Sequence, residues 1–314
     1  MSIPYNPDDQ EPRSYSNNGQ LNYLLTSDKK VVAFVGATKN GCSFVINNLA
    51  AMFSGMGVKT AILDMTESKN AYYIYTDNKE ELRQVAYTSI ENLEKGINEG
   101  IKVNSNLSVF TALPGKKDSS YDAQKILTTL AKNYSLVLID TDFKTELEYF
   151  SLATEIYLVQ SMDILTIQPF TSFLRELKTK GILKDDIKIV INKYVKCKDL
   201  SVKKIVGGLS LYNDPAMTFM TELFNRDAAQ TYVIPYESEN YAKYIECLVT
   251  CKVTLSGYTK EFIRSLKDLG NVVYPLLTSS DKKSGKKQEF NAPQQTTQFS
   301  PNMNNTLEQM RKKY

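Results

Sequence analysis

Seven short apolar runs recur along the chain, each at the length of a buried β-strand. They are nearly continuous in apolar residues, which is typical of strands in a parallel sheet that is covered on both faces. The runs predict strands at Val31–Val35, Thr60–Leu63, Leu107–Thr111, Leu136–Ile139, Glu155–Val159, Ile187–Ile191 and Thr231–Ile234.

Helical patterns lie between most of these runs. Strands that alternate with helices imply right-handed crossover connections. The sequence therefore predicts an α/β fold, a doubly wound and mainly parallel sheet with helices on both faces. The clearest helical segments are Ser43–Met56, Ala123–Lys132, Ile167–Lys178 and Met217–Phe224, with a last helix at Thr259–Gly270.

The periodic pattern occupies the middle of the 314 residues, which predicts one large domain at 29–277. Residues 1–28 are rich in Asn, Asp, Ser, Pro and Tyr without periodicity, so we expect a flexible N-terminal arm. Residues 278–314 are rich in Gln, Asn, Ser, Lys and Pro, and we expect a disordered C-terminal tail.

The net positive charge of the chain lies in the tail. Residues 277–314 hold seven basic and three acidic side chains, whereas the body before them is nearly neutral and gives no strong nucleic-acid signal. Residues 306–314 predict a short terminal helix with a thin apolar stripe, Leu307, Met310 and Tyr314. Either it is a solvated tail, or it binds a partner or touches a membrane surface weakly.

Composition excludes several kinds of chemistry. The chain has no histidine, so an imidazole base, a Ser-His or Cys-His nucleophile and a His-ligated metal are all absent. No window approaches ~18 uninterrupted apolar residues, which argues against a transmembrane helix. Four irregularly spaced cysteines fit a reducing cytoplasm better than a disulfide framework.

Residues 31–50 predict a strand, a tight loop and a helix, the layout of a phosphate-binding loop. The frame G-x-x-x-x-G-K-[ST] is met at Gly36, Gly41 and Ser43, but Cys42 stands at the lysine position. The backbone cradle and the helix N-terminus do not need that lysine. We therefore expect the phosphates of a nucleotide to lie on Gly36, Ala37, Thr38, Lys39, Asn40, Gly41, Cys42, Ser43 and Phe44.

Carboxylates follow two of the predicted strands. Asp64 ends the second strand, and Asp140 comes directly after Leu136–Ile139. A carboxylate at a strand tip beside a phosphate loop can contact Mg²⁺ directly or through water. The predicted metal ligands are Ser43, Asp64 and Asp140, and Asp64 is also a candidate catalytic residue.

With these motifs in this order, the chain resembles the MinD/ParA branch of the P-loop ATPases, across residues 29–275. The family's helix ending A-N-L-A is matched by Asn48–Ala50, its D-x-D-P by Asp64 with Thr66, and its I-D-x-P-P by Ile139–Phe143 without the prolines. Its V-L-N-[KR] strand end and its I-P-x-D segment are matched by Ile189–Lys193 and Ile234–Tyr236. The resemblance implies ATP or ADP with Mg²⁺, adenine contacts from Asn192 and Pro235, and a homodimer.

The chain departs from that family where its cations should be. Ala37 replaces the signature lysine, Cys42 replaces the loop lysine, and Thr66 replaces an aspartate. Because positive charge supports phosphoryl transfer, we expect at most a slow ATPase. Lys39 is the candidate substitute for the lost lysines.

The chain combines a degenerate phosphate loop with an otherwise complete set of motifs, and in this it resembles the TadZ/CpaE-like, pilus-associated branch of the family. That resemblance implies a positioning or assembly scaffold beside a pilus or secretion ATPase or an inner-membrane component, in the cytoplasm or peripherally at the inner face of the membrane. The alternative is an active ParA/MinD-type ATPase in DNA partition or division-site placement. A tyrosine-kinase-like relative ranks last, because the tail holds a single tyrosine, Tyr314.

Three tyrosines follow the second predicted strand: Tyr72, Tyr73 and Tyr75. They either form an interaction surface or pack on the sheet edge.

Overall fold

The computed structural model describes residues 19–26, 28–115, 121–183, 187–207 and 229–275. Within them lies one eight-stranded sheet in the order β3-β4-β2-β5-β1-β6-β7-β8, in which every neighbouring pair is parallel except β3 and β4. The strands are β1 (Lys30–Gly36), β2 (Thr60–Asp64), β3 (Ile101–Asn104), β4 (Leu107–Phe110), β5 (Leu136–Thr141), β6 (Glu155–Gln160), β7 (Lys188–Tyr194) and β8 (Gln230–Pro235).

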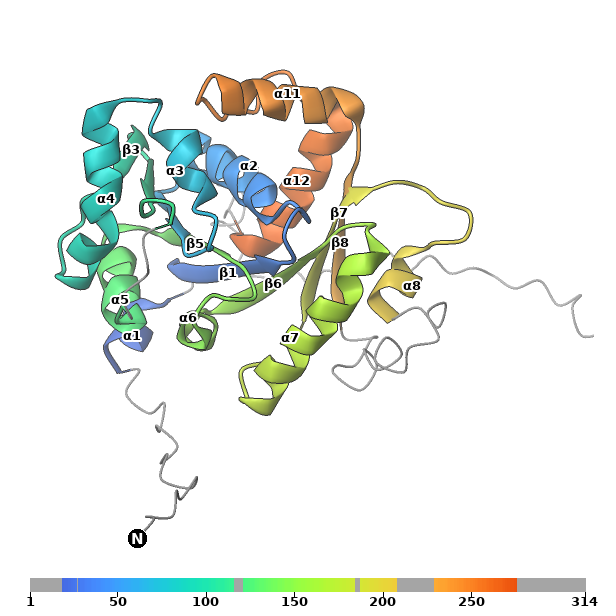
Figure 1. Ribbon diagram of the computed structural model, residues 1–314, viewed down its shortest axis with the longest axis horizontal. Helices are drawn as coiled ribbons and strands as arrows, with labels where there is room; N and C mark the ends of the chain where they lie inside the picture. The colour runs from blue at the N-terminus through green and yellow to red at the C-terminus, as the bar shows by residue number, and fades with distance from the viewer. Residues whose placement is uncertain (1–18, 27, 116–120, 184–186, 208–228, 276–314) are drawn as a thin grey trace, which may run out of the picture. The chain divides into compact units, whose positions relative to one another are not determined.

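Helices cover both faces of this sheet (Figure 1). On one face, α2 (Cys42–Gly55) packs on β1, β2, β4 and β5, and α12 (Lys260–Val273) packs on α2 and β8. The α12 side chains Phe262, Leu266, Leu269 and Val273 are buried and recur at helical spacing, which explains why this segment forms an amphipathic helix.

The other face carries the larger hydrophobic core. Buried strand residues such as Val31, Ala33 and Ile139 meet apolar side chains from the helices of this face. These helices include α1 (Gly19–Leu24), α5 (Ala123–Asn133), α6 (Leu147–Leu152), α7 (Ile167–Thr179) and α8 (Val202–Gly207). The remaining helices are α3 (Asn70–Tyr75), α4 (Glu80–Glu94) and α11 (Ser238–Val249), with a 3-10 turn, η1, at Ile164–Thr166.

The predicted α/β class and the seven predicted strands are confirmed, with end-points that shift by a few residues. Strand β3 was not predicted, because three of its four residues are exposed and the segment offers no apolar run. The predicted helix Met217–Phe224 lies outside the described residues. So do the residues expected to form the C-terminal tail, including Thr306–Tyr314.

The expectation of a flexible arm up to residue 28 is wrong for its last part. Residues Gly19–Leu24 form α1, and Leu21 is fully buried in the core cluster that also contains α5 side chains. The helix is only six residues long, which is too short for its few apolar residues to show a helical periodicity. Among the described residues, no helix is both long enough and apolar enough to cross a membrane.

The strand order reverses at β1, which lies between β5 and β6. In open parallel sheets, ligands bind beside this point, at the carboxyl ends of the strands. The loop that follows β1 therefore stands where a ligand site is expected.

Candidate functional site

The loop between β1 and α2 is tightly wound. The Asn40 N–H donates to the Ala37 carbonyl at 3.0 Å, and Lys39 and Gly41 have positive φ angles of 72° and 89°. A Cβ at Gly36 would come within 2.5 Å of the Val159 carbonyl oxygen, so only glycine fits at this position without a shift of the backbone. The loop thus has the close-packed form that the glycine spacing predicted.

Two asparagines hold the loop in place. The buried Asn40 side chain accepts from the Ser161 hydroxyl at 2.7 Å, and the Asn192 amide donates to the Asn40 carbonyl at 2.8 Å. A Cβ at Gly41 would lie 2.2 Å from the Asn192 amide nitrogen. Asn192, expected at the adenine, therefore supports the loop backbone, although it also lines the adjoining cavity.

Cys42 lies beneath the loop and supplies no positive charge. Its thiol is buried and lies 3.2 Å from the Phe34 carbonyl, to which it donates. Burial raises the pKa of the Cys42 thiol well above its usual value, and the nearby Asp140 carboxyl raises it further. The side chain at the lysine position is therefore neutral and points into the sheet.

Asp140 is the carboxyl group at the floor of the site. Burial, reinforced by the charge of Asp64, raises its pKa to about 7, and hydrogen bonds with Ser43 and Cys42 only partly oppose this shift. Its Oδ1 atom is buried and has no hydrogen-bond partner among the described residues. An unsatisfied carboxylate oxygen beside a serine hydroxyl suits Mg²⁺, which prefers oxygen ligands.

Asp64 is fully buried and does not line the cavity. Its two oxygens accept from the Thr66 hydroxyl at 2.6 Å and from the Ala71 N–H at 2.9 Å. Burial raises the pKa of Asp64, although these hydrogen bonds and the Lys69 charge partly oppose the rise. Asp64 therefore stabilises the turn that leads into α3, and its oxygens are already engaged there.

A cavity of about 750 Å³ opens over the loop and extends to α3 and α11. Its far end is lined by aromatic rings, Tyr73, Tyr236, Tyr241 and Tyr244. Of the predicted site residues, Asn40 and Asp64 do not line it. The others do: Gly36, Ala37, Thr38, Lys39, Gly41, Cys42, Ser43, Phe44, Asp140, Asn192 and Pro235.

Two lysines line the cavity beside the loop. Lys39 is exposed, and Lys193 donates from its ammonium to the Lys39 carbonyl at 2.7 Å. Lys193 was not among the predicted site residues, although it directly follows Asn192 in the strand-end motif. The signal that could have identified it is therefore its place in that motif.

The three tyrosines after β2 divide between the two predicted roles. Tyr75 is buried and donates to the Asn47 side chain at 3.0 Å, whereas Tyr73 is 62% exposed and lines the cavity. Tyr75 therefore packs beneath α2, and Tyr73 is available at the cavity wall.

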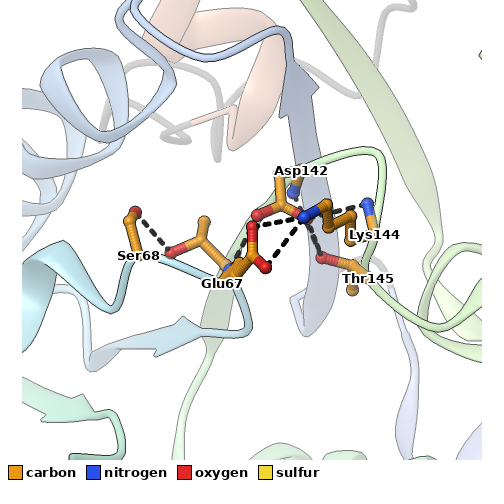
Figure 2. A network of polar contacts seen from close by, with 6 residues as sticks. Glu67, Ser68, Asp142, Lys144 and Thr145 are labelled. Carbon is orange, nitrogen blue, oxygen red and sulfur yellow. Dashed lines mark hydrogen bonds and ion pairs between the residues drawn. The ribbon is translucent and has the colours of Figure 1, made fainter. Parts of the chain in front are cut away.

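A polar network joins the loop after β2 to the loop after β5 at the cavity rim (Figure 2). The Asp142 carboxylate accepts from the Glu67 N–H at 2.7 Å and from the Lys144 N–H at 2.9 Å. Figure 2 shows the Lys144 ammonium facing both oxygens of Glu67, at 2.8 and 2.7 Å. The two loops are therefore coupled, and the cation between them is already paired with a carboxylate.

Comparison with known proteins identifies the fold. No family model and no curated protein matches the chain. Among solved structures, a ParA-family ATPase of Chlorobium tepidum matches with a TM-score of 0.58 and 13% identity, over 77% of this chain and 98% of that chain. A chain of the MinC:MinD cell division complex of Aquifex aeolicus matches with a TM-score of 0.55 and 16% identity, over 79% and 99%.

A third similar structure is a Borrelia burgdorferi protein of proposed plasmid-partition function, bound to AMPPNP. Its TM-score is 0.51 and its identity 14%, over 78% of this chain and 98% of that chain. The chain therefore has the fold of the MinD/ParA-type P-loop ATPases, as the resemblance implied.

Proposed function

We propose that this protein is a nucleotide-binding positioning factor of the MinD/ParA type in which ATP hydrolysis is slow or lost. The observation that carries this proposal is Cys42. The residue at the loop-lysine position is a neutral thiol that is buried under the loop and donates a hydrogen bond to the Phe34 carbonyl. The glycine loop that would hold the phosphates is kept, while the lysine that supports phosphoryl transfer is missing.

The described residues fit a bound nucleotide with Mg²⁺. Residues of the loop and the first residues of α2 line the cavity, and a helix N-terminus of this kind attracts phosphate. Ser43 and Asp140 are the residues that would hold Mg²⁺, which neutralises phosphate charge when it is bound. The aromatic end of the cavity, with Pro235 at its wall, fits a base.

The scaffold role rests on the resemblance to the TadZ/CpaE-like branch. We propose that the chain positions a pilus or secretion machine, with a secretion ATPase or an inner-membrane component as its partner and with a homodimer as its working form. The order of degenerate motifs on a complete fold supports this proposal. Co-purification of the tagged chain with a pilus or secretion ATPase from its own cells tests it, and a stable complex with DNA-partition proteins instead would count against it.

A second candidate is an active ParA/MinD-type ATPase that uses Lys39 in place of the lost lysines. It is favoured by the position of Lys39, which is exposed and lines the cavity. Under this alternative, Lys39→Ala abolishes phosphate release. Under the proposed function, the variant leaves an already low rate unchanged.

Nucleotide binding is tested by calorimetry of the full chain with MgATP, using two glycine variants. Gly41→Ala strains a positive φ angle and drives its Cβ against Asn192, so we expect at least a ~10-fold loss of affinity. Gly55→Ala is the matched control, because a Cβ there meets no atom within 4 Å. Equal affinities for the two variants, or no binding by the unmodified chain, would contradict the proposal.

A further inference from the structure

A strongly basic surface lies beside the nucleotide cavity, on the segment that runs from the end of β7 into α8. Residues 193–204, here called the basic segment, contain five lysines and one aspartate. All five are exposed: Lys193, Lys196, Lys198, Lys203 and Lys204. Residues 1–276 together carry a net charge of about −1, so this is a local concentration of positive charge on a body that is otherwise slightly acidic.

The fold directs this charge outward. Figure 1 shows the loop after β7 extending away from the sheet before it returns to α8. The Lys204 ammonium donates to the Asp199 backbone carbonyl at 2.6 Å, a contact that does not neutralise its charge. Among the described residues, no ion pair involves Lys196, Lys198 or Lys203. The basic segment therefore presents several lysines to solvent together.

Exposed apolar side chains lie at the same edge of the sheet. Val195 is 47% exposed within the basic segment, and Leu165, in the turn after β6, is 72% exposed. Strands β6 and β7 are parallel neighbours, so the loops at their carboxyl ends are adjacent. Asn40 links them, since its side chain lies 3.4 Å from the Thr166 hydroxyl and its carbonyl accepts from Asn192.

We propose that the basic segment, with Leu165 and Val195, is a docking surface for an anionic lipid bilayer. Lysines are attracted to anionic lipid headgroups, and neighbouring apolar side chains can enter the headgroup region. A polyanion such as DNA fits less well. The segment contains no arginine, the residue best suited to bidentate contacts with phosphate. The exposed leucine and valine would add nothing to phosphate binding.

The proposal is tested by sedimentation of the full chain with vesicles of phosphatidylcholine alone or mixed with phosphatidylglycerol. We expect binding to the anionic vesicles only, weakened by salt. Replacing Lys196, Lys198 and Lys203 with glutamine should lower the partition coefficient about 100-fold. The matched control replaces Lys95, Lys102 and Lys132 with glutamine; these lysines are also exposed but lie elsewhere, and their loss should change the partition coefficient by no more than about two-fold.

A second readout uses Cys197, which is exposed within the basic segment. In a Cys251→Ser background, an environment-sensitive dye on Cys197 should shift to the blue with anionic vesicles and stay unchanged with neutral ones. Both triple variants keep the basic tail, so any contribution of the tail cancels in their comparison. No preference for anionic vesicles, equal losses in the two triple variants, or loss of duplex DNA binding with vesicle binding intact would each overturn the proposal.

Discussion

The pKa of a carboxyl group is shifted in opposite directions at the two ends of the central sheet. At the amino ends of the strands, Glu155 lies between Lys30 at 2.8 Å and Lys188 at 3.2 Å. Burial alone would raise the pKa of Glu155, but the Lys30 hydrogen bond and the Lys188 charge outweigh it and lower that pKa. At the carboxyl ends, Asp140 has no such cation, and its pKa rises to about 7.

The difference shows what the candidate site lacks. Burial raises the pKa of both carboxyl groups; two lysines outweigh this rise at Glu155, whereas the charge of Asp64 adds to it at Asp140. A P-loop ATPase ordinarily places a lysine at its phosphate loop. Here the loop-lysine position holds a neutral thiol beside a partly protonated carboxyl, and the nearby Lys193 is hydrogen-bonded to the loop backbone.

Restoring the cation should have the largest effect. Cys42→Lys places an ammonium at the loop position that normally reaches the phosphates, so we expect ATP turnover to rise ~10²–10³-fold. Phosphate release at saturating MgATP measures it. Cys42→Ala is the control, because it removes the thiol without adding charge, and its rate should match that of the unmodified chain. A rise in both variants would show that the thiol itself inhibits.

Removing the Asp140 charge should stabilise the free protein in a pH-dependent way. The folded carboxyl has a pKa of about 7, whereas an unfolded aspartate has about 3.9, so the folded state holds a proton that the unfolded state releases between those values. Stability of the unmodified chain should therefore fall as pH rises from about 4 to about 7. Asp140→Asn should reduce this fall, of which the raised pKa of Asp64 leaves a part, and should add about 2 kcal/mol at pH 8.

Urea unfolding of both proteins across this pH range measures the effect, without nucleotide or metal. Parallel stability curves for the two proteins would mean that Asp140 is ionised in the fold throughout, and the contrast with Glu155 would then fail.

Removing Glu155 should destabilise the fold, the opposite outcome. Glu155→Gln leaves Lys30 and Lys188 close together without their shared carboxylate, which should cost about 1–2 kcal/mol at pH 7. Because the folded pKa is lowered, this stabilisation is present above the unfolded pKa of about 4.3 and is lost as pH falls through the folded value. Thermal unfolding at pH 7 and at pH 3 checks both parts, and an equal loss at the two values would be inconsistent with the pairing.

Breaking the ion pair at the cavity rim should have the smallest effect. Lys144 and Glu67 are 71% and 67% exposed, so Lys144→Met should leave the free energy of unfolding nearly unchanged. Asp142→Ala loses the acceptor for two backbone N–H groups and should cost about 1–2 kcal/mol. Denaturant unfolding separates the two, and a large loss in Lys144→Met would give the pair a structural weight that its exposure does not predict.

Most of the sheet could be predicted from the sequence, because its parallel strands are buried on both faces and appear as apolar runs. The loop and Asp140 were found for the same reason, since each directly follows such a run. The roles of individual side chains were harder to predict. Asn192 is predicted to contact adenine and lines the cavity, but its hydrogen bond to the loop backbone, 152 residues earlier in the chain, has no local signal in the sequence.

The Lys30–Glu155–Lys188 cluster could not be predicted from the sequence for a related reason. Its members begin β1, β6 and β7, and they meet only because these strands are neighbours in the sheet. Strand order is a property of the whole fold and is not encoded in any local pattern. Asp64 differs, because its hydrogen bonds are local: its place at a strand tip predicts a metal ligand, whereas the turn that leads into α3 brings Thr66 and Ala71 to its oxygens.

The central claim is that the phosphate loop binds nucleotide but lacks the lysine that supports hydrolysis. Its most direct test is steady-state phosphate release by the unmodified full chain, at a MgATP concentration that calorimetry shows to be saturating. We predict tight enough binding to measure, with turnover no faster than about 0.1 s⁻¹. Saturable binding together with sustained turnover of about 1 s⁻¹ or more would contradict the account.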